Sequence, residues 1–389
     1  MGEFGAIELA SILMQAKYGR NDKSRLVPYI VGDPGVGKTS TIEQLGKSFE
    51  AVYGTEVPVI TINPHMYDPF EVCGLPAIVN DSYKITAPPW FTDIRDYDGP
   101  AILLLDEISS LSTALQSKLL RLLAHGELNY KLGLPATTMV IAAGNPSQTA
   151  TDAFLFDPAF SARLCFIKWD AQSSFDYWMR GMISGCQFEP PTIPVLPADW
   201  KKLLPIWGAC IAGFVRSHME FECHPSEGNE PWPTRRTWTY GAVACAAVEA
   251  CGGSNEEIGM VLTGCVGQKA AGALMSWKEV QSVVDVEELL QDAVRRVQNG
   301  KKVLLPEAAV RRLDIVFAIV AALLSCLYRD TTDDRYNAVC ALLTAMCDAG
   351  FSEAATYGAI ALFEQHRRKL PADLLKRLQT VHSYIPFKS

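Results

Sequence analysis

The sequence predicts an α/β fold for about the first 170 residues, with a parallel sheet between two layers of helices. Two observations lead to this fold class. Several runs of strand length are apolar throughout, which is typical of parallel strands that are buried on both faces. Segments with apolar residues at helical spacing separate these runs, and strands that alternate with helices form three-layer structures. Beyond about residue 170 almost every apolar segment has helical length and spacing, so the remaining chain is expected to be helical.

The elements of the α/β region can be placed in order along the chain. Residues 6–18 have helical spacing, and residues 25–33 read as a strand that runs into a glycine-rich loop. A second helix is expected over 39–53, where Gly54 would end it. Four further buried strands are expected, at 57–63, 101–107, 137–145 and 164–169.

The change of pattern also divides the chain. We expect an α/β domain at 1–170, a helical domain at 171–280 and a further helical extension at 281–389. The longest apolar run, at 315–328, has 14 residues, whereas roughly 20 are needed to span a bilayer. We interpret this run as a buried helix, and no membrane span is expected.

The composition limits the compartment and the class of partner. The formal net charge is −8 and the isoelectric point about 5.4, which argues against general binding to nucleic acid phosphates. The 11 cysteines are scattered without a C-x-x-C pair, as in a protein with reduced thiols. The N-terminus shows no signal-peptide pattern, so a cytoplasmic location is expected.

The most specific signal is the glycine-rich loop. Residues 32–39, Gly-Asp-Pro-Gly-Val-Gly-Lys-Thr, fit the phosphate-binding pattern G-x-x-x-x-G-K-[ST] between a strand and a helix. Glycines allow the backbone to approach a phosphate closely, and the N-terminus of the helix attracts the anion. Lys38 would reach the β- and γ-phosphates and Thr39 would bind Mg²⁺. The alternative is a turn that binds nothing. The other expected nucleotide-binding residues of the loop are Gly32, Asp33, Pro34, Gly35, Val36, Gly37 and Ser40.

Two carboxylates follow the strand expected at 101–107. In an open parallel sheet, ligands bind at the carboxyl ends of the strands. Asp106 would therefore hold Mg²⁺, and Glu107 would activate the attacking water as a general base. The alternative is that the pair caps the helix that follows.

Three further polar positions fit the same chemistry. Asn145 ends an apolar strand and could orient the water or contact the γ-phosphate; alternatively, it forms a turn before Pro146. Arg163 could neutralise charge on a transferring phosphoryl group, in its own chain or in a neighbouring subunit. Arg235 and Arg236 are expected at a helix start, where basic residues oppose the helix dipole and hint at a nearby anion. For Arg163 the alternative is a surface salt bridge. For Arg235 and Arg236 it is a solvated pair.

In this order the motifs resemble those of the AAA+ ATPase superfamily, which combines a P-loop NTPase core with a helical lid. Residues 32–39 resemble Walker A and residues 102–107 resemble Walker B. Asn145 stands where the family has sensor 1, and Arg163 where it has the arginine finger, although the usual Asp-Arg-Phe is here Ala-Arg-Leu. The start of the helix at Arg236, or alternatively at Arg235, resembles sensor 2.

The segment between the two Walker-like motifs narrows the resemblance. Residues 68–76, Asp-Pro-Phe-Glu-Val-Cys-Gly-Leu-Pro, open an insert at about 66–90 with a hairpin-like stretch whose turn would be Asn80-Asp81. This insert resembles the helix-2 insert of the MoxR-like, dynein-related branch. Residues 113–129 and 140–146 fit the same branch.

The resemblance implies that the chain binds ATP and Mg²⁺ and hydrolyses ATP in a homo-oligomeric ring, commonly a hexamer. Relatives of this branch act as chaperone-like remodelers of a protein partner, often one with a von Willebrand factor A (VWA) domain. The alternative is a nucleic-acid-directed AAA+ motor or loader, which the acidic charge disfavours, as does an insert whose only basic residue is Lys84. A third possibility is a nucleotide-gated scaffold with little turnover.

Overall fold

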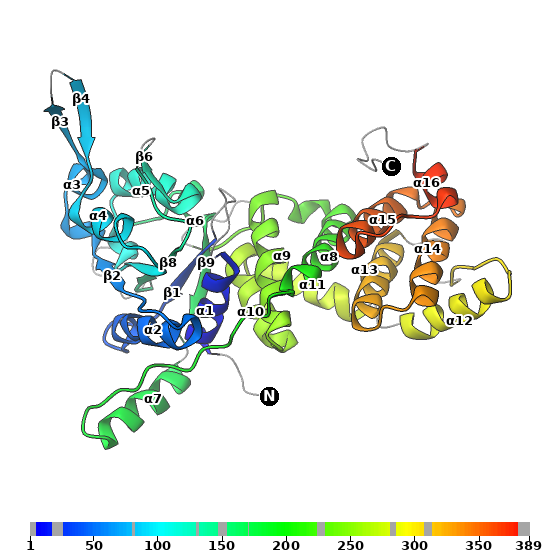
Figure 1. The fold of residues 1–389 in the computed structure, drawn as a ribbon, viewed down its shortest axis with the longest axis horizontal. Coiled ribbons are helices and arrows are strands. Elements are labelled where there is room, and N and C mark those ends of the chain that lie inside the picture. The colour runs from blue at the N-terminus through cyan, green and yellow to red at the C-terminus, as the bar shows by residue number, and fades with distance from the viewer. Residues whose placement is uncertain are drawn as a thin grey trace. The chain divides into compact units, whose positions relative to one another are not determined.

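The computed structural model describes nine stretches of the chain, which are residues 5–17, 26–79, 82–129, 132–146, 154–169, 171–223, 230–280, 285–306 and 313–379. The chain forms two compact units (Figure 1). The first comprises Met1–Pro197 and His224–Gln268, and the second Ala198–Cys223 and Lys269–Ser389. These limits differ from the three regions expected from the sequence, and a division into core, lid and extension stays a prediction.

A five-stranded parallel sheet forms the centre of the first unit. Its strands lie in the order β2-β5-β8-β1-β9, and each neighbouring pair is parallel. Each strand lies within a run that the sequence marks as apolar, so the predicted sheet is confirmed. The strands are β1 (Val27–Val31), β2 (Val59–Ile62), β5 (Ala101–Leu105), β8 (Thr138–Gly144) and β9 (Leu164–Lys168).

Nine α-helices lie in the described part of the first unit. The two expected first are confirmed, and the second of them ends at Gly54, whose left-handed φ of 70° suits a glycine C-cap. The helices are α1 (Ala6–Lys17), α2 (Lys38–Tyr53), α3 (Pro69–Cys73), α4 (Pro89–Arg95), α5 (Thr113–His125), α6 (Pro158–Ser161), α7 (Ala171–Ile183), α9 (Arg235–Ala250) and α10 (Asn255–Val266). Two short 3-10 helices, η1 (Pro64–Met66) and η2 (Ile108–Ser110), follow β2 and β5.

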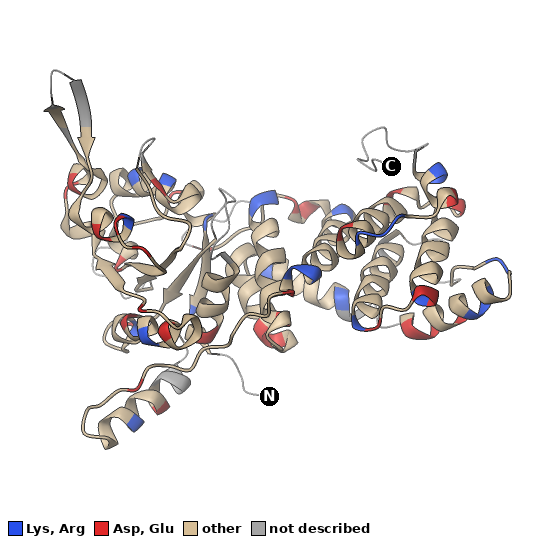
Figure 2. Cartoon of the chain, viewed as in Figure 1, with Lys and Arg blue, Asp and Glu red and all other residues tan. Residues whose placement is uncertain are grey.

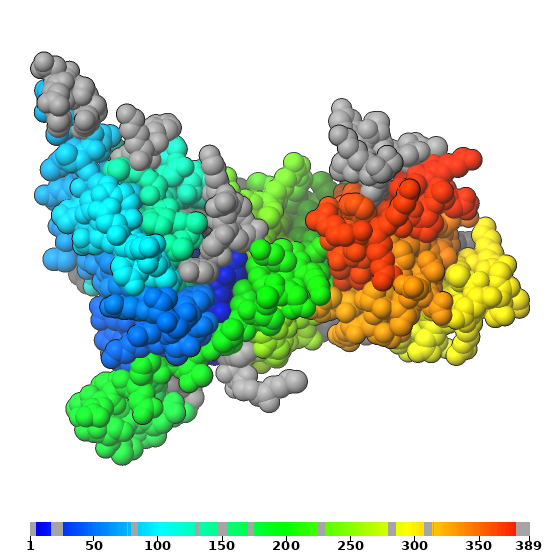
Figure 3. Space-filling model, in the orientation of Figure 1, coloured from blue at the N-terminus to red at the C-terminus, as the bar shows by residue number. Residues whose placement is uncertain are grey.

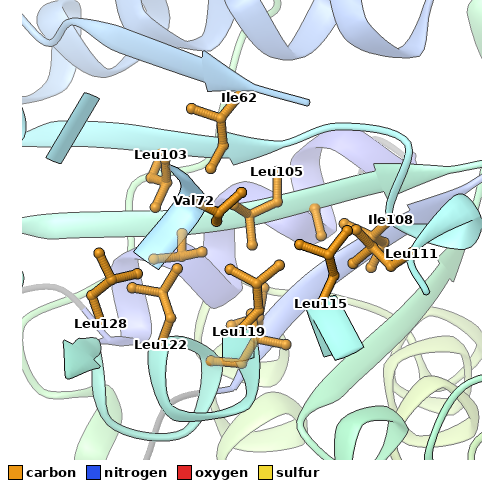
Figure 4. Packing of buried hydrophobic residues seen from close by; sticks show 14 of the residues in the cluster. Ile62, Val72, Leu103, Leu105, Ile108, Leu111, Leu115, Leu119, Leu122 and Leu128 are labelled. Atoms are coloured by element: carbon orange, nitrogen blue, oxygen red, sulfur yellow. The ribbon is translucent and has the colours of Figure 1, made fainter. Parts of the chain in front are cut away.

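The core of the first unit explains how the layers hold together. On one face of the sheet, Leu103 and Leu105 of β5 pack with Leu115, Leu119 and Leu122 of α5 (Figure 4). All five are almost completely buried, and burial of a leucine side chain contributes about 1.5–3 kcal/mol. Helices α3, α4 and α6 add residues to the same cluster.

The alternate residues of the strands serve the other face. Ile102 and Leu104 are also fully buried, and successive side chains of a strand point to opposite faces. Helices α1 and α2 contact the sheet strands, and their own buried residues, such as Leu13 and Leu45, complete the third layer. The predicted three-layer architecture is therefore confirmed.

Two hairpins extend from the layers. Strands β3 (Leu75–Val79) and β4 (Ser82–Thr86) pair in antiparallel fashion within the insert expected at 66–90, as Figure 1 shows. The predicted turn at Asn80-Asp81 lies outside the described residues. A shorter antiparallel pair is formed by β6 (Glu127–Asn129) and β7 (Leu132–Gly133).

The described residues of the second unit form helices and the segments that connect them. The run at 315–328 lies within α13, where residues such as Phe317, Leu323 and Leu327 are almost fully buried, so the predicted buried helix is confirmed. No helix in the described part of the chain is long and apolar enough to cross a membrane. The helices are η3 (Trp200–Leu203), α8 (Leu204–Ser217), η4 (Met219–Phe221), α11 (Gln268–Val280), α12 (Val286–Gln298), α13 (Leu313–Arg329), α14 (Asp333–Asp348), α15 (Ser352–His366) and α16 (Ala372–Gln379).

Charges of both signs lie along the helices of the second unit (Figure 2). The guanidinium of Arg335 on α14 donates to both carboxylate oxygens of Glu287 on α12, across 2.6 and 2.9 Å. Arg377 of α16 donates to Asp348 at the end of α14 across 2.7 Å. These pairs join α12 to α14 and α14 to α16, so each links two helices that one other helix separates in the chain.

Candidate functional site

The glycine-rich loop lies between β1 and α2, as the sequence predicts. Gly35 and Gly37 have φ values of 79° and 88°, which residues with a Cβ adopt only at a cost in free energy. Helix α2 begins directly after Gly37, and the loop residues from Asp33 to Gly37 are exposed. The backbone is thus bent to present the N-terminus of a 16-residue helix to an anion.

Lys38 occupies the centre of the site. Its ammonium group donates to the carbonyl oxygens of Gly32 and Asp33, both at 2.7 Å, and to Asn145 Oδ1 at 3.1 Å. Burial lowers the pKa of Lys38, and the nearby carboxylates, of which Asp106 acts most strongly, oppose this shift. The contact joins the loop after β1 to the end of β8.

Thr39 and Asp106 form the next pair. The Thr39 hydroxyl donates to Asp106 Oδ2 across 2.9 Å, which brings together the two oxygen ligands that the sequence assigns to Mg²⁺. A hydroxyl and one carboxylate suit Mg²⁺, because this ion keeps several waters and shares its remaining positions with substrate phosphates. The described residues contain no group of three or more His, Cys, Asp or Glu that could hold a metal ion.

Glu107 stands beside this pair in an uncommon backbone conformation. Its φ of 54° is left-handed, which is rare for a residue other than glycine and is often found at functional sites. Helix α5 begins later, at Thr113, and its N-cap is Ser112. The alternative that the two carboxylates cap this helix is therefore not what the structure shows.

The structure adds two neighbours of Glu107 that the sequence reasoning missed. The side-chain amide of Asn63, directly after β2, donates to Glu107 Oε2 at 3.2 Å. His65 Nδ1 of η1 lies 3.4 Å from the same oxygen. One signal was present in the sequence, because Asn63 ends an apolar strand in the same way as Asn145. The sequence did not indicate that β2 and β5 are neighbours in the sheet, and this neighbourhood produces the contact.

Asn145 is held from a second direction. Its backbone N–H donates to the Ser109 hydroxyl at 3.1 Å, and Ser109 belongs to η2, which follows the carboxylates. A Cβ on the preceding Gly144 would lie 2.6 Å from the Tyr29 hydroxyl, so a larger residue there would have to displace the Tyr29 side chain. The ends of β5 and β8 are therefore fixed against each other.

Another close approach was not expected from the sequence. A Cβ on Gly32 would lie 2.6 Å from Trp169 Cβ and 3.4 Å from Lys38 Cδ. Trp169 follows β9, and its backbone N–H donates to the carbonyl of Val31 at 2.7 Å. Gly32 is thus required by the tryptophan that packs against it.

Arg163 lies at the amino ends of the strands, whereas the phosphate loop lies at their carboxyl ends. Its carbonyl accepts a hydrogen bond from the N–H of Val27, the first residue of β1, at 3.2 Å. The loop follows the last residue of the same strand. Five residues of strand span about 16 Å, so the structure does not bring Arg163 to Lys38 within one chain.

A second positive charge accompanies Arg163. Burial lowers the pKa of the Arg163 guanidinium, and Arg236 lowers it further. Arg163 Nε is buried without a hydrogen-bond partner, and Nη1 donates to the carbonyl of Ala159. Arg236 lies in the first turn of α9, which Thr234 caps, so the predicted helix start is confirmed. The two arginines form a basic group away from the loop.

Comparison with known proteins agrees with this geometry. The family of AAA domains of the dynein-related subfamily matches residues 29–164, which include the loop, the carboxylates, Asn145 and Arg163. A comparison with curated protein sequences finds no significant match.

Two solved structures are similar at low identity. A protein from Cytophaga hutchinsonii that is described as an ATPase has 14% identity and a TM-score of 0.40, covering 67% of this chain and 81% of its own. A full-length MCM homolog from Methanopyrus kandleri has 14% identity and a TM-score of 0.37, covering 69% of this chain and 53% of its own. At these values neither likeness indicates a function. The sheet order, the phosphate loop and the family match together show an AAA+ P-loop NTPase fold, in which residues 29–164 match a dynein-related AAA domain.

Proposed function

We propose that this chain hydrolyses ATP, with Mg²⁺, at the carboxyl edge of its sheet and uses the energy to remodel a protein partner, as a MoxR-type AAA+ ATPase. One observation carries the proposal, namely that Lys38, Thr39, Asp106, Glu107 and Asn145 from three strand ends gather at one place. This set provides a phosphate cradle, oxygen ligands for the cation and a carboxylate for water.

The roles follow from the contacts. Lys38 would exchange its bonds to the loop carbonyls for phosphate oxygens, while Asp33, Pro34, Gly35, Val36, Gly37 and Ser40 would line the phosphates. Thr39 and Asp106 would hold Mg²⁺, which neutralises phosphate charge when bound. Glu107 would take the proton of the attacking water, and Asn145 would orient that water or contact the γ-phosphate.

A neighbouring copy would complete the site. Arg163 lies about one strand length from the loop of its own chain, so its contribution to phosphoryl transfer would be made in a second chain. Arg236, as sensor 2, would contribute beside Arg163, because the two charges lie close together; Arg235 remains the alternative. Such head-to-tail contacts close into rings, and we propose a hexamer.

The insert supports a protein client. The exposed apolar residues on η1, α3 and β3, and at the end of η1, are Met66, Tyr67, Phe70, Leu75 and Ile78. Exposed apolar groups suit a protein surface, whereas binding of nucleic acid needs clustered Lys and Arg. We propose that the chain acts in the cytoplasm on a client of this kind, and a VWA-domain protein is the candidate partner.

A subunit-mixing experiment tests the composite site. Glu107→Gln removes the base and keeps Arg163, whereas Arg163→Ala removes the arginine and keeps the base. Each variant alone should lose at least about 100-fold of ATP turnover. An equal mixture should recover a clear fraction, because some sites combine Glu107 from one chain with Arg163 from another. A mixture that stays as inactive as its parts, or a Glu107→Gln variant with full turnover, contradicts the proposal.

A further inference from the structure

Helix α7 carries an apolar stripe that the first unit leaves exposed. Phe175, Trp178, Met179, Met182 and Ile183 are between 40% and 80% exposed. Their spacing of i, i+3, i+4, i+7 and i+8 places them on one face of the helix, as in an amphipathic helix that packs on a partner. Figure 3 shows α7, in green at the lower left, projecting from the surface of this unit.

The other face of α7 is already fixed to its own unit. The Tyr177 ring lies 5.9 Å from that of Phe188, and the Tyr177 hydroxyl donates to the carbonyl of Glu189 at 2.7 Å. A Cβ on Gly181 would lie only 2.1 Å from Phe188, so the packing there is close. The Tyr177 hydroxyl also bonds with the side-chain amide of Gln44 on α2 at 3.1 Å. The apolar stripe is therefore not the inward face of the helix.

The place of α7 in the fold indicates what covers the stripe. The helix follows β9, whose parallel neighbour is β1, and the phosphate loop follows β1 at the same edge of the sheet. The bond between Tyr177 and Gln44 ties α7 to the helix that begins at Lys38. A second copy whose Arg163 reaches Lys38 must lie over this edge, and α7 leaves the sheet at the same edge.

The chain also supplies a different apolar patch for a head-to-tail contact. Phe154 and Leu155 are 44% and 71% exposed and precede α6, the helix that leads to Arg163. A heterologous interface needs two different patches on each copy. Phe154 and Leu155 therefore provide a second apolar patch, distinct from the stripe, for such an interface.

We propose that the α7 stripe is a subunit contact, which packs on the arginine-bearing side of a second copy of this chain. This inference rests on the proposed completion of the ATP site by a neighbouring copy. It makes the stripe a requirement for assembly, and assembly a requirement for ATP turnover.

Two double variants with identical spacing test the contact. Trp178→Ser with Met182→Ser removes the centre of the stripe, and Asp176→Ser with Arg180→Ser changes the polar side of the same helix without altering net charge. Both are compared with the full chain in the Glu107→Gln background, with ATP and Mg²⁺, by sedimentation velocity over a concentration series. ATP binding measured by equilibrium dialysis checks that each variant is folded.

The stripe variant should need at least about tenfold more protein to assemble, because a buried interface tryptophan commonly accounts for more than a tenfold change in affinity. Its ATP binding should be unchanged, and the polar variant should assemble like the parent. A stripe variant that assembles like the polar variant overturns the inference alone, even if the stripe then proves to bind another protein. A parent chain that stays monomeric overturns both the inference and the proposed intersubunit site.

Discussion

The side-chain amide of Asn63 donates a hydrogen bond to the carboxylate of Glu107 across 3.2 Å. His65 Nδ1 lies 3.4 Å from the same oxygen, so two side chains restrain the proposed base. Both lie directly before α3 and the β3–β4 hairpin. The segment that would meet a client is therefore continuous with the segment that positions Glu107.

Replacement of Asn63 by alanine should raise ATP turnover in the absence of a client, by about two- to tenfold. A net hydrogen bond contributes about 1 kcal/mol, and more when one partner is charged, while 1.4 kcal/mol corresponds to tenfold in rate. Loss of this hydrogen bond would let the Glu107 carboxylate move away from residue 63, and toward the attacking water, more often. Steady-state phosphate release measures the effect.

The matched control is Thr61→Ala, two residues before Asn63 and on β2. This change removes the 3.3 Å hydrogen bond from the Thr61 hydroxyl to Glu43. This control should leave turnover close to that of the parent. If Asn63→Ala instead slows turnover at constant ATP binding, Asn63 holds Glu107 in its working position. The hydrogen bond would then promote ATP turnover, contrary to the prediction.

Arg163 should be unfavourable for the stability of its own chain. Its Nε is buried without a partner, and Arg236 adds a like charge nearby. An unsatisfied buried donor costs about 1–3 kcal/mol. Arg163→Ala should therefore leave the melting temperature of the unassembled chain unchanged or higher, while turnover falls by at least about 100-fold.

Differential scanning calorimetry at low protein concentration measures this stability, and Arg121→Ala is the control. Arg121 donates to Glu127 at 3.0 Å, so its loss should lower the melting temperature slightly. A clear loss of stability in Arg163→Ala would mean that contacts in its own chain, such as the bond to the Ala159 carbonyl, outweigh the unsatisfied Nε, and its proposed role in a neighbour would lose support.

Much of the sheet and half of the site follow from local sequence. Strands such as Ala101–Leu105 are apolar from end to end, and the loop at 32–39 has a fixed spacing of glycines, lysine and threonine. Asp106 and Glu107 follow their strand directly. These signals need no knowledge of which strands are neighbours.

The remaining contacts depend on spatial order, which local patterns do not contain. Asn63 meets Glu107 because β2 pairs with β5, although 44 positions separate them in sequence. Trp169 restricts Gly32 because β9 pairs with β1. The exposed stripe of α7 has the same helical spacing as a core helix, so the sequence alone cannot say which face is buried.

Gly32 should be intolerant of even one added methyl group. In Gly32→Ala the new Cβ would lie 2.6 Å from Trp169 Cβ, which is attached directly to the backbone and cannot rotate away. Overpacking of this kind costs about 1–3 kcal/mol, and the displaced loop would hold Lys38 less well. ATP affinity, measured by equilibrium dialysis, should fall by about tenfold or more.

Gly272→Ala in α11 provides the control, because nothing lies within 4 Å of a Cβ there. Alanine is the better helix former by about 1 kcal/mol, so this variant should be as stable as the parent or more stable, with unchanged ATP affinity. If Gly32→Ala binds ATP like the parent, Trp169 moves at little cost and does not shape the loop.

The ion pair between Glu287 and Arg335 should make the second unit sensitive to acid. Hydrogen bonds from Arg335 lower the pKa of Glu287 to about 2, whereas a glutamate in an unfolded chain has a pKa of about 4.3. Because the folded pKa is the lower one, the pair stabilises the folded state fully above about pH 5. This contribution is lost progressively as the pH falls from about 5 toward 2. Since the Glu287 side chain is 43% exposed, it amounts to about 1 kcal/mol or less.

Calorimetry of the full chain at several pH values measures the effect. Glu287→Gln should melt below the parent at pH 7, and the difference should shrink as the pH falls from about 5 toward 3.5. Glu288→Gln, at the neighbouring exposed position of the same helix, is the control and should track the parent throughout. A difference that stays constant down to pH 3.5 would mean that Glu287 titrates like an ordinary glutamate in both states, so that its bonds to Arg335 add nothing to stability.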